Sequence, residues 1–509
     1  MRPALFLVTT LSAGALFAPA MFGQITPALT SEACSRLKSL ALPDTTIESA
    51  DLVAAGPFRS PVPGPGPAST MQLPAHCRVT AWVKPSSDSN IEVAVWLPAA
   101  DWNGKFLAVG NGGWAGVVSY PAMAQSLFEG YATASTDTGH KGGNVSFAMG
   151  HLEKMIDYGY RSEHEMTVKA KAIINAYYGR PATLSYWNGC STGGKQGLME
   201  AQRFPDDYDG IIAGAPANYQ THLHSWTVWA GYTTMKDPAG FVPPAKYAAI
   251  HKAAIAACDT IDGVKDGVLN DPRKCKFDPA KLLCSGAEND SCLTSAQVET
   301  VKKLYTAPKW KTGEIIFPPF EPGSEMSWNL LAGGKTPADI GIDTFRWTYN
   351  DANWGWRNFD LDRDTLAADR AENGMINATN PDLSKFKAHG GKLLMYHGWA
   401  DGLIAPENAI NYYNSVQAKM GGKQEDWYRL FMVPGMQHCR GGEGPNQFNA
   451  VAAMERWREQ GSAPPQIIAS HLTDGNIDTT RPLCPYPQAA VWNGKGSTND
   501  AANFSCKAQ

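Results

Sequence analysis

The sequence lacks the motifs that would place it in several common protein classes. No two of its ten cysteines form a Cys-x-x-Cys pair, so a zinc site of that kind is not expected. No Gly-x-Gly-x-x-Gly motif precedes an expected helix, which argues against a dinucleotide site. The formal net charge is only −4, so there is no basic footprint for nucleic acid.

Long apolar runs are also missing, apart from one at the N-terminus. Arg2 is followed by an apolar run from Ala4 to Ala18 and by small residues around Ala20. The run is short for a membrane span, and its flanks are typical of a secretory signal peptide. We expect residues 1–23 to be that peptide, cleaved near Ala20 or Gly23. A secreted or periplasmic protein without a membrane partner follows from this.

What remains is an ordinary globular composition in a long chain. The 509 residues are 43% hydrophobic and 18% charged, enough for several domains or one large domain with an insertion. An even number of cysteines behind an export signal indicates disulfides. The pattern alone does not fix their connectivity. Local pairing would join Cys258 to Cys275, Cys284 to Cys292, and Cys484 to Cys506.

One short stretch carries the clearest chemical motif. Residues 182–187 are expected to form a strand and Lys195–Arg203 a helix, with Gly189-Cys190-Ser191-Thr192-Gly193 between them. A strand, a Gly-x-Ser-x-Gly turn and a helix make a nucleophile elbow, in which Ser191 is the nucleophile. An ordinary glycine turn is the alternative, because this chain contains 49 glycines.

Strands and helices alternate around this motif. Residues 77–83 and 91–97 alternate like antiparallel strands, whereas 105–109, 131–137 and 208–216 resemble buried strands. Residues 158–178 are expected to form a long helix. The pattern from about 105 to 216 predicts an α/β fold, a mainly parallel sheet with helices on both faces. Residues 24–75, with the proline-rich stretch Pro61–Pro67, are interpreted as an N-terminal arm.

The pattern changes between residues 217 and 385, where apolar strands become rare. We interpret 217–385 as a lid domain inserted over the carboxyl edge of the sheet. Residues 24–216 and 386–509 would then form the catalytic domain.

The lid contains a run of aspartates that suggests a cation. Asp259, Asp262 and Asp266 are close enough in sequence to repel one another unless they share a positive ion. Carboxylate and carbonyl oxygens suit Ca²⁺, so the carbonyls of Val264 and Val268 are added as ligands. The spacing is not that of an EF-hand, and two Asp-Gly turns are the alternative. We expect a structural Ca²⁺ here.

Two further strands, near residues 392–397 and 428–433, each end in a loop with a polar candidate. The first loop contains Asp401 and the second contains His438. The order Ser, Asp, His is that of an α/β-hydrolase triad, with His438 as the base and Asp401 as its partner. His397 is the alternative base, but its place at the end of a strand favours a role in supporting the loop.

The two cysteines beside these residues give a test of the triad. Cys190 directly precedes Ser191, and Cys439 directly follows His438. If the serine and the histidine meet, their neighbours lie within the range that a disulfide requires. We therefore expect a Cys190–Cys439 bond, with two unrelated buried thiols as the alternative.

Together these motifs resemble the tannase and feruloyl esterase family along nearly the whole mature chain. The matching segments are Gly189-Cys190-Ser191, His438-Cys439, Trp102–Phe106, Arg203–Pro205, Asp209–Pro216, Val433–Met436 and Arg481–Pro487. The resemblance implies an α/β-hydrolase core with a large inserted lid that binds Ca²⁺ through Asp259, Asp262, Val264, Asp266 and Val268. It implies oxyanion donors at the backbone N–H groups of Gly113 and Thr192. It also implies five disulfides: Cys34–Cys77, Cys190–Cys439, Cys258–Cys275, Cys284–Cys292 and Cys484–Cys506.

The same resemblance implies a serine esterase for small aromatic-acid esters, feruloyl or galloyl, from plant cell walls or polyphenols. A mono(2-hydroxyethyl) terephthalate hydrolase of the family is the alternative. Its substrate-binding arginine corresponds to Gly355 here, with Arg357 two residues on, and one of its aromatic residues corresponds to Ile404. Two further hypotheses come from other functional classes. The protein could be a non-catalytic polyphenol- or carbohydrate-binding protein, or an acyltransferase that uses the same triad.

Overall fold

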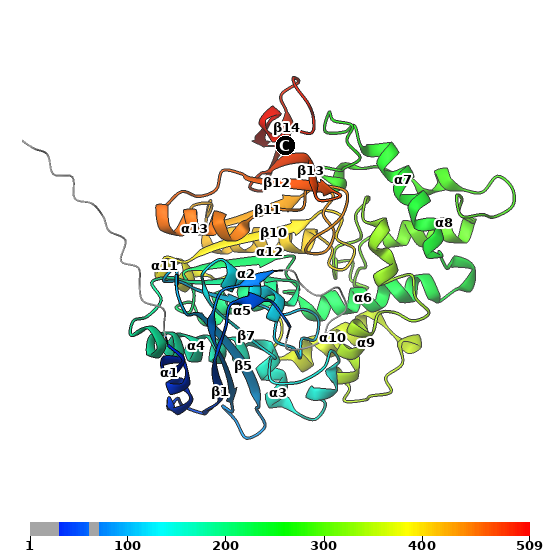
Figure 1. Cartoon of the computed structure of the whole chain (residues 1–509). Coiled ribbons are helices and arrows are strands. Elements are labelled where there is room, and N and C mark those ends of the chain that lie inside the picture. Colours follow the sequence, from blue (N-terminus) through cyan, green and yellow to red (C-terminus); the bar gives the residue numbers. More distant parts are fainter. Residues whose placement is uncertain (1–29, 61–70, 509) are drawn as a thin grey trace, which may run out of the picture.

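The computed structural model describes residues 30–60 and 71–508. The expected signal peptide and the stretch Pro61–Pro67 lie outside the described residues. A nine-stranded sheet runs through the molecule in the order β1-β4-β5-β7-β6-β8-β9-β10-β11 (Figure 1). Its strands are β1 (Thr45–Val53), β4 (His76–Val83), β5 (Ile91–Pro98), β6 (Phe106–Val109), β7 (Ala132–Thr136), β8 (Ser185–Cys190), β9 (Gly210–Gly214), β10 (Lys392–Gly398) and β11 (Tyr428–Val433).

The sheet is mixed in the way the sequence predicts. Neighbouring strands from β7 to β11 are parallel, and β1, β4, β5 and β7 pair in an antiparallel way. The interpretation of residues 24–75 as an arm is wrong for Thr45–Val53, which forms the edge strand β1. Its burial pattern is irregular because only one face of an edge strand packs on the core, so alternation is weak there.

Helices cover both faces of the sheet because its buried strands alternate their side chains between two cores. Leu393 and Met395 belong to the larger core and Leu394 to the smaller one. The helices α4 (Ser162–Tyr178), α5 (Thr192–Arg203) and α12 (Glu407–Met420) supply the larger core. The helices α2 (Tyr120–Phe128) and α13 (Ala450–Gln460) pack on the other face.

The segment between β9 and β10 is helical and lies beside the sheet, in green and yellow-green in Figure 1. It contains α6 (Gln220–Met235), α7 (Tyr247–Cys258), α8 (Ser295–Leu304), α9 (Asp339–Thr348) and α10 (Leu361–Glu372). The short helix α11 (Ser384–His389) follows and packs in the main core at the other side of the molecule in Figure 1. This segment has a separate apolar core, which includes Trp226, Phe320 and Trp328. Leu383 already packs in the main core. The division into catalytic and lid domains stays a prediction, and we call residues 217–385 the inserted segment.

Two small antiparallel hairpins follow α13 at the C-terminal end, at the top of Figure 1. They are formed by β12 (Ile467–Thr473) with β13 (Asn476–Leu483), and by β14 (Gln488–Trp492) with β15 (Phe504–Ala508). In the described ranges no helix has the length and apolar character needed to cross a bilayer.

All ten cysteines lie in the described part of the chain and are paired. The five disulfides are the expected ones, Cys34–Cys77, Cys190–Cys439, Cys258–Cys275, Cys284–Cys292 and Cys484–Cys506.

Candidate active site

Ser191 lies at a sharp turn between β8 and α5, with φ 63° and ψ −124°. Non-glycine residues rarely adopt this conformation, so the surroundings must enforce it. The Ser191 N–H donates to Gly214 O at 3.0 Å, and the Ser191 carbonyl accepts from Ala217 N at 3.1 Å. A Cβ on Gly189 would come within 2.4 Å of Gly193 O, so the turn requires glycine at that position. The predicted nucleophile elbow is present.

Asp401 and His438 follow the ends of the adjacent parallel strands β10 and β11. His438 Nδ1 lies 2.7 Å from Asp401 Oδ2. The other carboxylate oxygen, Asp401 Oδ1, accepts from the backbone N–H groups of Leu403 at 2.8 Å and Ile404 at 3.0 Å. The carboxylate is therefore oriented by its own loop and directed toward the imidazole.

His397 also contacts the same carboxylate. Its Nε2 lies 3.0 Å from Asp401 Oδ2 and 3.0 Å from Ile404 O, and the side chain is fully buried. Because both neighbours are acceptors, Nε2 must carry the proton and donate to them. The geometry thus favours the loop-supporting role for His397 over the role of base.

Burial and charge both shift the pKa values of Asp401 and His438. Burial opposes ionisation of Asp401, but the charge of His438 and hydrogen bonds from both histidines lower the pKa of its carboxyl below the ordinary value. Burial also opposes protonation of His438, yet the Asp401 carboxylate raises the pKa of that imidazole. The pair stabilises an imidazolium, as a general base requires once it has taken a proton.

The Cys190–Cys439 disulfide joins the nucleophile loop to the histidine loop, with a Cα–Cα distance of 6.0 Å. Its two cysteines are the immediate neighbours of Ser191 and His438, so these loops come together as the sequence predicted. The hydrogen bonds among described residues do not include one from Ser191 Oγ to His438. Such bonds are often formed only when substrate is bound.

Gly113 and Thr192, the expected oxyanion donors, are directly connected. Thr192 Oγ1 donates to Gly113 O at 2.7 Å. Thr192 is the first residue of α5, and Gly113 has φ 60° in the loop after β6. Among the described groups, neither backbone N–H has a hydrogen-bond acceptor. Two free N–H groups beside the nucleophile suit a developing oxyanion.

A buried polar network that the sequence analysis did not single out fixes this loop. Gln196 Oε1 accepts from Asn111 N at 3.0 Å, and Gln196 Nε2 donates to Asn111 Oδ1 at 3.1 Å and to Glu163 Oε1. Asn111 Nδ2 donates to Val117 O at 2.7 Å. The only sequence signal for this network is position, because Asn111 follows Gly110 and Gln196 lies in the elbow helix α5. Glu163 of α4 carries no such signal.

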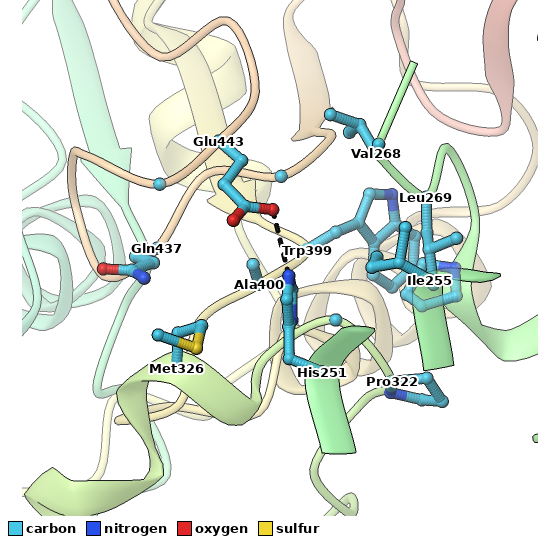
Figure 2. A pocket seen from close by; sticks show the side chains of 15 residues that line it. His251, Ile255, Val268, Leu269, Pro322, Met326, Trp399, Ala400, Gln437 and Glu443 are labelled. Carbon is cyan, nitrogen blue, oxygen red and sulfur yellow. Dashed lines mark hydrogen bonds and ion pairs between the residues drawn. The ribbon is translucent and has the colours of Figure 1, made fainter. Parts of the chain in front are cut away.

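A pocket of about 170 Å³ separates the catalytic loops from the inserted segment (Figure 2). Trp399, Ala400 and Gln437 line it next to Asp401 and His438, and Leu269 and Met326 line it from the inserted segment. His251 also lines the pocket and lies 2.9 Å from Glu443 of the histidine loop (Figure 2). Its other ring nitrogen lies 2.9 Å from the buried Glu325.

The aspartate loop forms tight turns. Asp259 Oδ1 accepts from Asp266 N and Gly267 N, and Asp262 Oδ1 accepts from Val264 N. Asp266 pairs with Arg481 at 2.6 Å. Asp259 Oδ2 and Asp262 Oδ2 have no protein partner among the described residues. Free carboxylate oxygens in this partly exposed loop fit a hard cation, and the expectation of Ca²⁺ stays a prediction.

A different set of side chains lies close enough together to hold a metal ion. The candidate ligand atoms of His164, Glu200 and Asp207 lie within 4.8 Å of one another. This set was not expected from the sequence. It lies at the far end of α5 from Ser191 and is not part of the active site.

Gly355, Arg357 and Ile404 are the positions that were compared with the terephthalate hydrolase. Arg357 is exposed and its guanidinium lies 4.6 Å from the Trp356 ring. A Cβ on Gly355 would meet no closer atom than Asn353 O at 4.0 Å. Ile404 is buried beside His397.

Comparisons with known proteins agree with this geometry. Residues 77–507 match the family described as tannase and feruloyl esterase. An uncharacterized esterase of Xanthomonas campestris pv. campestris is 40% identical over 95% of this chain and 92% of its own length. A probable feruloyl esterase B-1 of Aspergillus oryzae is 35% identical over 85% of this chain and 84% of its own length.

Solved structures support the same assignment. The crystal structure of feruloyl esterase B from Aspergillus oryzae covers 94% of this chain and 100% of its own, with 32% identity and a TM-score of 0.88. A tannin acyl hydrolase from Aspergillus niger, at 23% identity, covers 95% of each chain with a TM-score of 0.78 and shows the shared fold. This chain therefore belongs to the tannase and feruloyl esterase family of carboxylic ester hydrolases.

Proposed function

We propose that this protein hydrolyses esters of hydroxycinnamic or gallic acids through an acyl-enzyme on Ser191. The observation that carries the proposal is the Asp401–His438 hydrogen bond, in a loop that a disulfide joins to the nucleophile loop. The names of the relatives, feruloyl esterase B and tannin acyl hydrolase, support the choice of acid.

In the first half-reaction, Ser191 Oγ attacks the ester carbonyl carbon and His438 Nε2 takes the hydroxyl proton. The negative charge on the carbonyl oxygen is stabilised by the N–H groups of Gly113 and Thr192. The C–O bond to the alcohol then breaks, and His438 gives its proton to the leaving oxygen. The aromatic acyl group remains on Ser191.

In the second half-reaction, water attacks the acyl-enzyme and His438 takes the proton of that water. The second tetrahedral oxyanion is stabilised by the same two N–H groups. When it collapses, the proton on His438 returns to Ser191 Oγ and the aromatic acid leaves. Asp401 remains ionised throughout, which is consistent with its lowered pKa.

The test is a comparison of kcat/KM on methyl ferulate, methyl gallate and mono(2-hydroxyethyl) terephthalate, with Ser191→Ala as the matched control. We expect a phenolic methyl ester to be the best substrate and the Ser191→Ala protein to fold but not turn over. Product analysis with added alcohol separates hydrolysis from acyl transfer. Turnover by Ser191→Ala, or preference for the terephthalate ester, would contradict the proposal.

We also propose a structural Ca²⁺ held by the carboxylates of Asp259, Asp262 and Asp266 and the carbonyls of Val264 and Val268. The free oxygens Asp259 Oδ2 and Asp262 Oδ2 support it. The ion, together with Arg481, which already pairs with Asp266, would neutralise the three carboxylates and stiffen the loop that follows Cys258.

The test of this ion is thermal. After treatment with EDTA, added CaCl₂ should raise the Tm of the wild type and leave Asp262→Asn unchanged, because a ligand that binds only the folded state stabilises it. Asp290→Asn, an exposed aspartate of the inserted segment, is the control and should respond like the wild type. A Tm insensitive to calcium in the wild type would contradict the site.

Secretion or export to the periplasm is likewise a proposal. Five disulfides support it, because such bonds persist in oxidising compartments. Small aromatic esters from plant cell walls or polyphenols would be the substrates encountered there. Fractionation of expressing cells, with activity measured in medium, periplasm and cytoplasm, tests the location.

A further inference from the structure

The carbonyl of Gly113 accepts hydrogen bonds from two hydroxyl groups at once. Thr192 Oγ1 donates at 2.7 Å and Tyr158 Oη donates at 3.2 Å. A carbonyl has two lone pairs, so these donors satisfy it and fix the plane of the 113–114 peptide. Tyr158 is fully buried, in the π-helical turn η3 (Asp157–Arg161) that precedes α4.

The peptide before Gly113 is fixed as well. Gly112 O accepts from Ala115 N at 2.9 Å. In a trans peptide the N–H points away from the carbonyl of the same unit, so this bond sets the direction of the Gly113 N–H. The loop therefore needs two supports: its own turn at Gly112, and the hydroxyls of Thr192 and Tyr158 at Gly113.

Tyr158 is in turn oriented by the inserted segment and by the nucleophile helix. Gln220, the first residue of α6, donates from Nε2 to Tyr158 Oη at 2.9 Å. Because that bond occupies a Tyr158 lone pair, the tyrosine proton is directed to Gly113 O. Lys195 of α5 lies over the Tyr158 ring, with Nζ 4.2 Å from the ring centroid and 3.4 Å from Gln220 Oε1.

Lys195 is an unusual group in this position. Its side chain is fully buried, and burial lowers its pKa to about 8 against the opposing charge of Glu163. Burying an ammonium group costs free energy unless partners compensate, and the proposed chemistry uses no lysine. Its contacts with the ring of Tyr158 and with Gln220 give it a role in ordering both.

We propose that Tyr158, oriented by Gln220 and Lys195, is a positioning residue for the oxyanion hole and couples the inserted segment to the reactive site. The inference rests on the proposed function, since it concerns the same oxyanion. A second contact also joins the Gly113 loop to the inserted segment. Trp114 Nε1 donates to Ile340 O of α9 at 3.1 Å. The donor at Gly113 thus lies between two contacts with the inserted segment.

The main experiment compares Tyr158→Phe with Tyr177→Phe. Both changes remove one buried phenolic hydroxyl, but the Tyr177 hydroxyl has no hydrogen-bond partner in the described structure. For Tyr158→Phe we expect kcat to fall about tenfold with KM changed less than twofold, below the roughly 100-fold loss for removing an oxyanion donor. Tyr177→Phe should match the wild type in both constants.

A second readout separates positioning from general damage to the fold. An arylboronic acid that forms a tetrahedral adduct with Ser191 mimics the oxyanion, whereas the free aromatic acid mimics the ground state. In Tyr158→Phe the boronic acid should bind about tenfold more weakly and the free acid with unchanged affinity. Gln220→Leu should show the same pattern with a smaller factor.

Thr192 supplies a rescue series, because its backbone N–H is unchanged by substitution of the side chain. Thr192→Val removes the hydroxyl that donates to Gly113 and should lose kcat about as Tyr158→Phe does. Thr192→Ser keeps the hydroxyl and should restore activity to within about twofold of the wild type.

Three outcomes would overturn the inference. Tyr158→Phe could match Tyr177→Phe in kcat, it could weaken the boronic acid and the free acid equally, or Thr192→Ser could be as inactive as Thr192→Val. A wild type that hydrolyses none of the aromatic esters would instead contradict the proposed function. The two failures are therefore distinguishable.

Discussion

The catalytic edge of the sheet and the inserted segment are organised by different interactions. At the edge, short backbone hydrogen bonds fix the reactive groups, as for Asp401 with Leu403 N and Ile404 N. In the inserted segment, long side chains reach across, as Lys246 does to Glu288, Gln297 and the carbonyl of Cys292. The comparison indicates that a local turn orients the Asp401 carboxylate, whereas side chains distant in sequence hold the inserted segment together.

Several polar contacts join the two regions, and two of them lie beside the catalytic loops. His251 links the inserted segment to Glu443 of the histidine loop, and Gln220 links it to Tyr158. A change in the inserted segment can therefore reach the site through definite side chains. The predictions below test whether the edge and the inserted segment respond as differently as their contacts indicate.

The largest effect is expected at the edge, from Asp401→Asn. Loss of the carboxylate charge should lower kcat by about 10⁴-fold, because the imidazolium is no longer stabilised and the tautomer of His438 is wrong. His397→Gln is the matched change on the same carboxylate. It should cost less than about 100-fold, since Leu403 N and Ile404 N still orient Asp401. Steady-state kinetics decide, and equal losses would show that the Asp401 carboxylate depends on His397 and not on its own loop for its function.

The second-largest effect is expected when one disulfide is removed from each region. Cys190–Cys439 spans 249 residues and Cys284–Cys292 spans 8. By loop entropy, the first pair changed to alanine should lower the free energy of unfolding by about 3 kcal/mol more than the second. Only the first should also lower kcat/KM. Urea unfolding and kinetics measure both, and equal destabilisation would show that the longer bond does not constrain the unfolded chain.

The smallest effect concerns the contact between the regions. Burial alone would lower the pKa of His251, but hydrogen bonds to Glu325 and Glu443 raise it to about 10. A folded-state pKa above the unfolded value means that the stabilisation is complete below about pH 6.5 and is lost as pH rises through about 10.

His251→Gln should therefore lower Tm by a few degrees at pH 6 and by less at pH 10. His471→Gln, which removes a histidine–aspartate pair from the β12–β13 hairpin, is the control and should change Tm little at either pH. A pH-independent loss in His251→Gln would show that the histidine stabilises by packing alone.

The sequence predicted the catalytic edge well because its determinants are local. Ser191 is identified by flanking glycines and by the strand and helix around it, and the cysteines beside Ser191 and His438 predicted that their loops meet. The edge strand Thr45–Val53 was not predicted, because it is stabilised by pairing with β4, which is not adjacent in sequence. The buried contacts of Tyr158 and Lys195 were not predicted for the same reason. Nothing in the local sequence indicates that a lysine four residues after the nucleophile is buried.

The boundaries of the inserted segment were placed by composition, and the division into domains stays a prediction. Leu383, shortly before the predicted end at residue 385, packs in the main core. The segment's aromatic core and its contact with Trp114 through Ile340 depend on tertiary packing, which no spacing of residues encodes. Substrate preference should depend on this region, which is why the choice among aromatic acids needs kinetics.

The central claim is that folding brings Ser191, His438 and Asp401 together as one acylating centre. Incubation of the purified protein with an aryl phosphonate ester, followed by peptide mass mapping, tests it most directly. We predict a single covalent adduct on Ser191, formed at a rate that falls sharply in Asp401→Asn. Esterase activity that persists after complete labelling, or an adduct on another residue that abolishes activity, would contradict the claim.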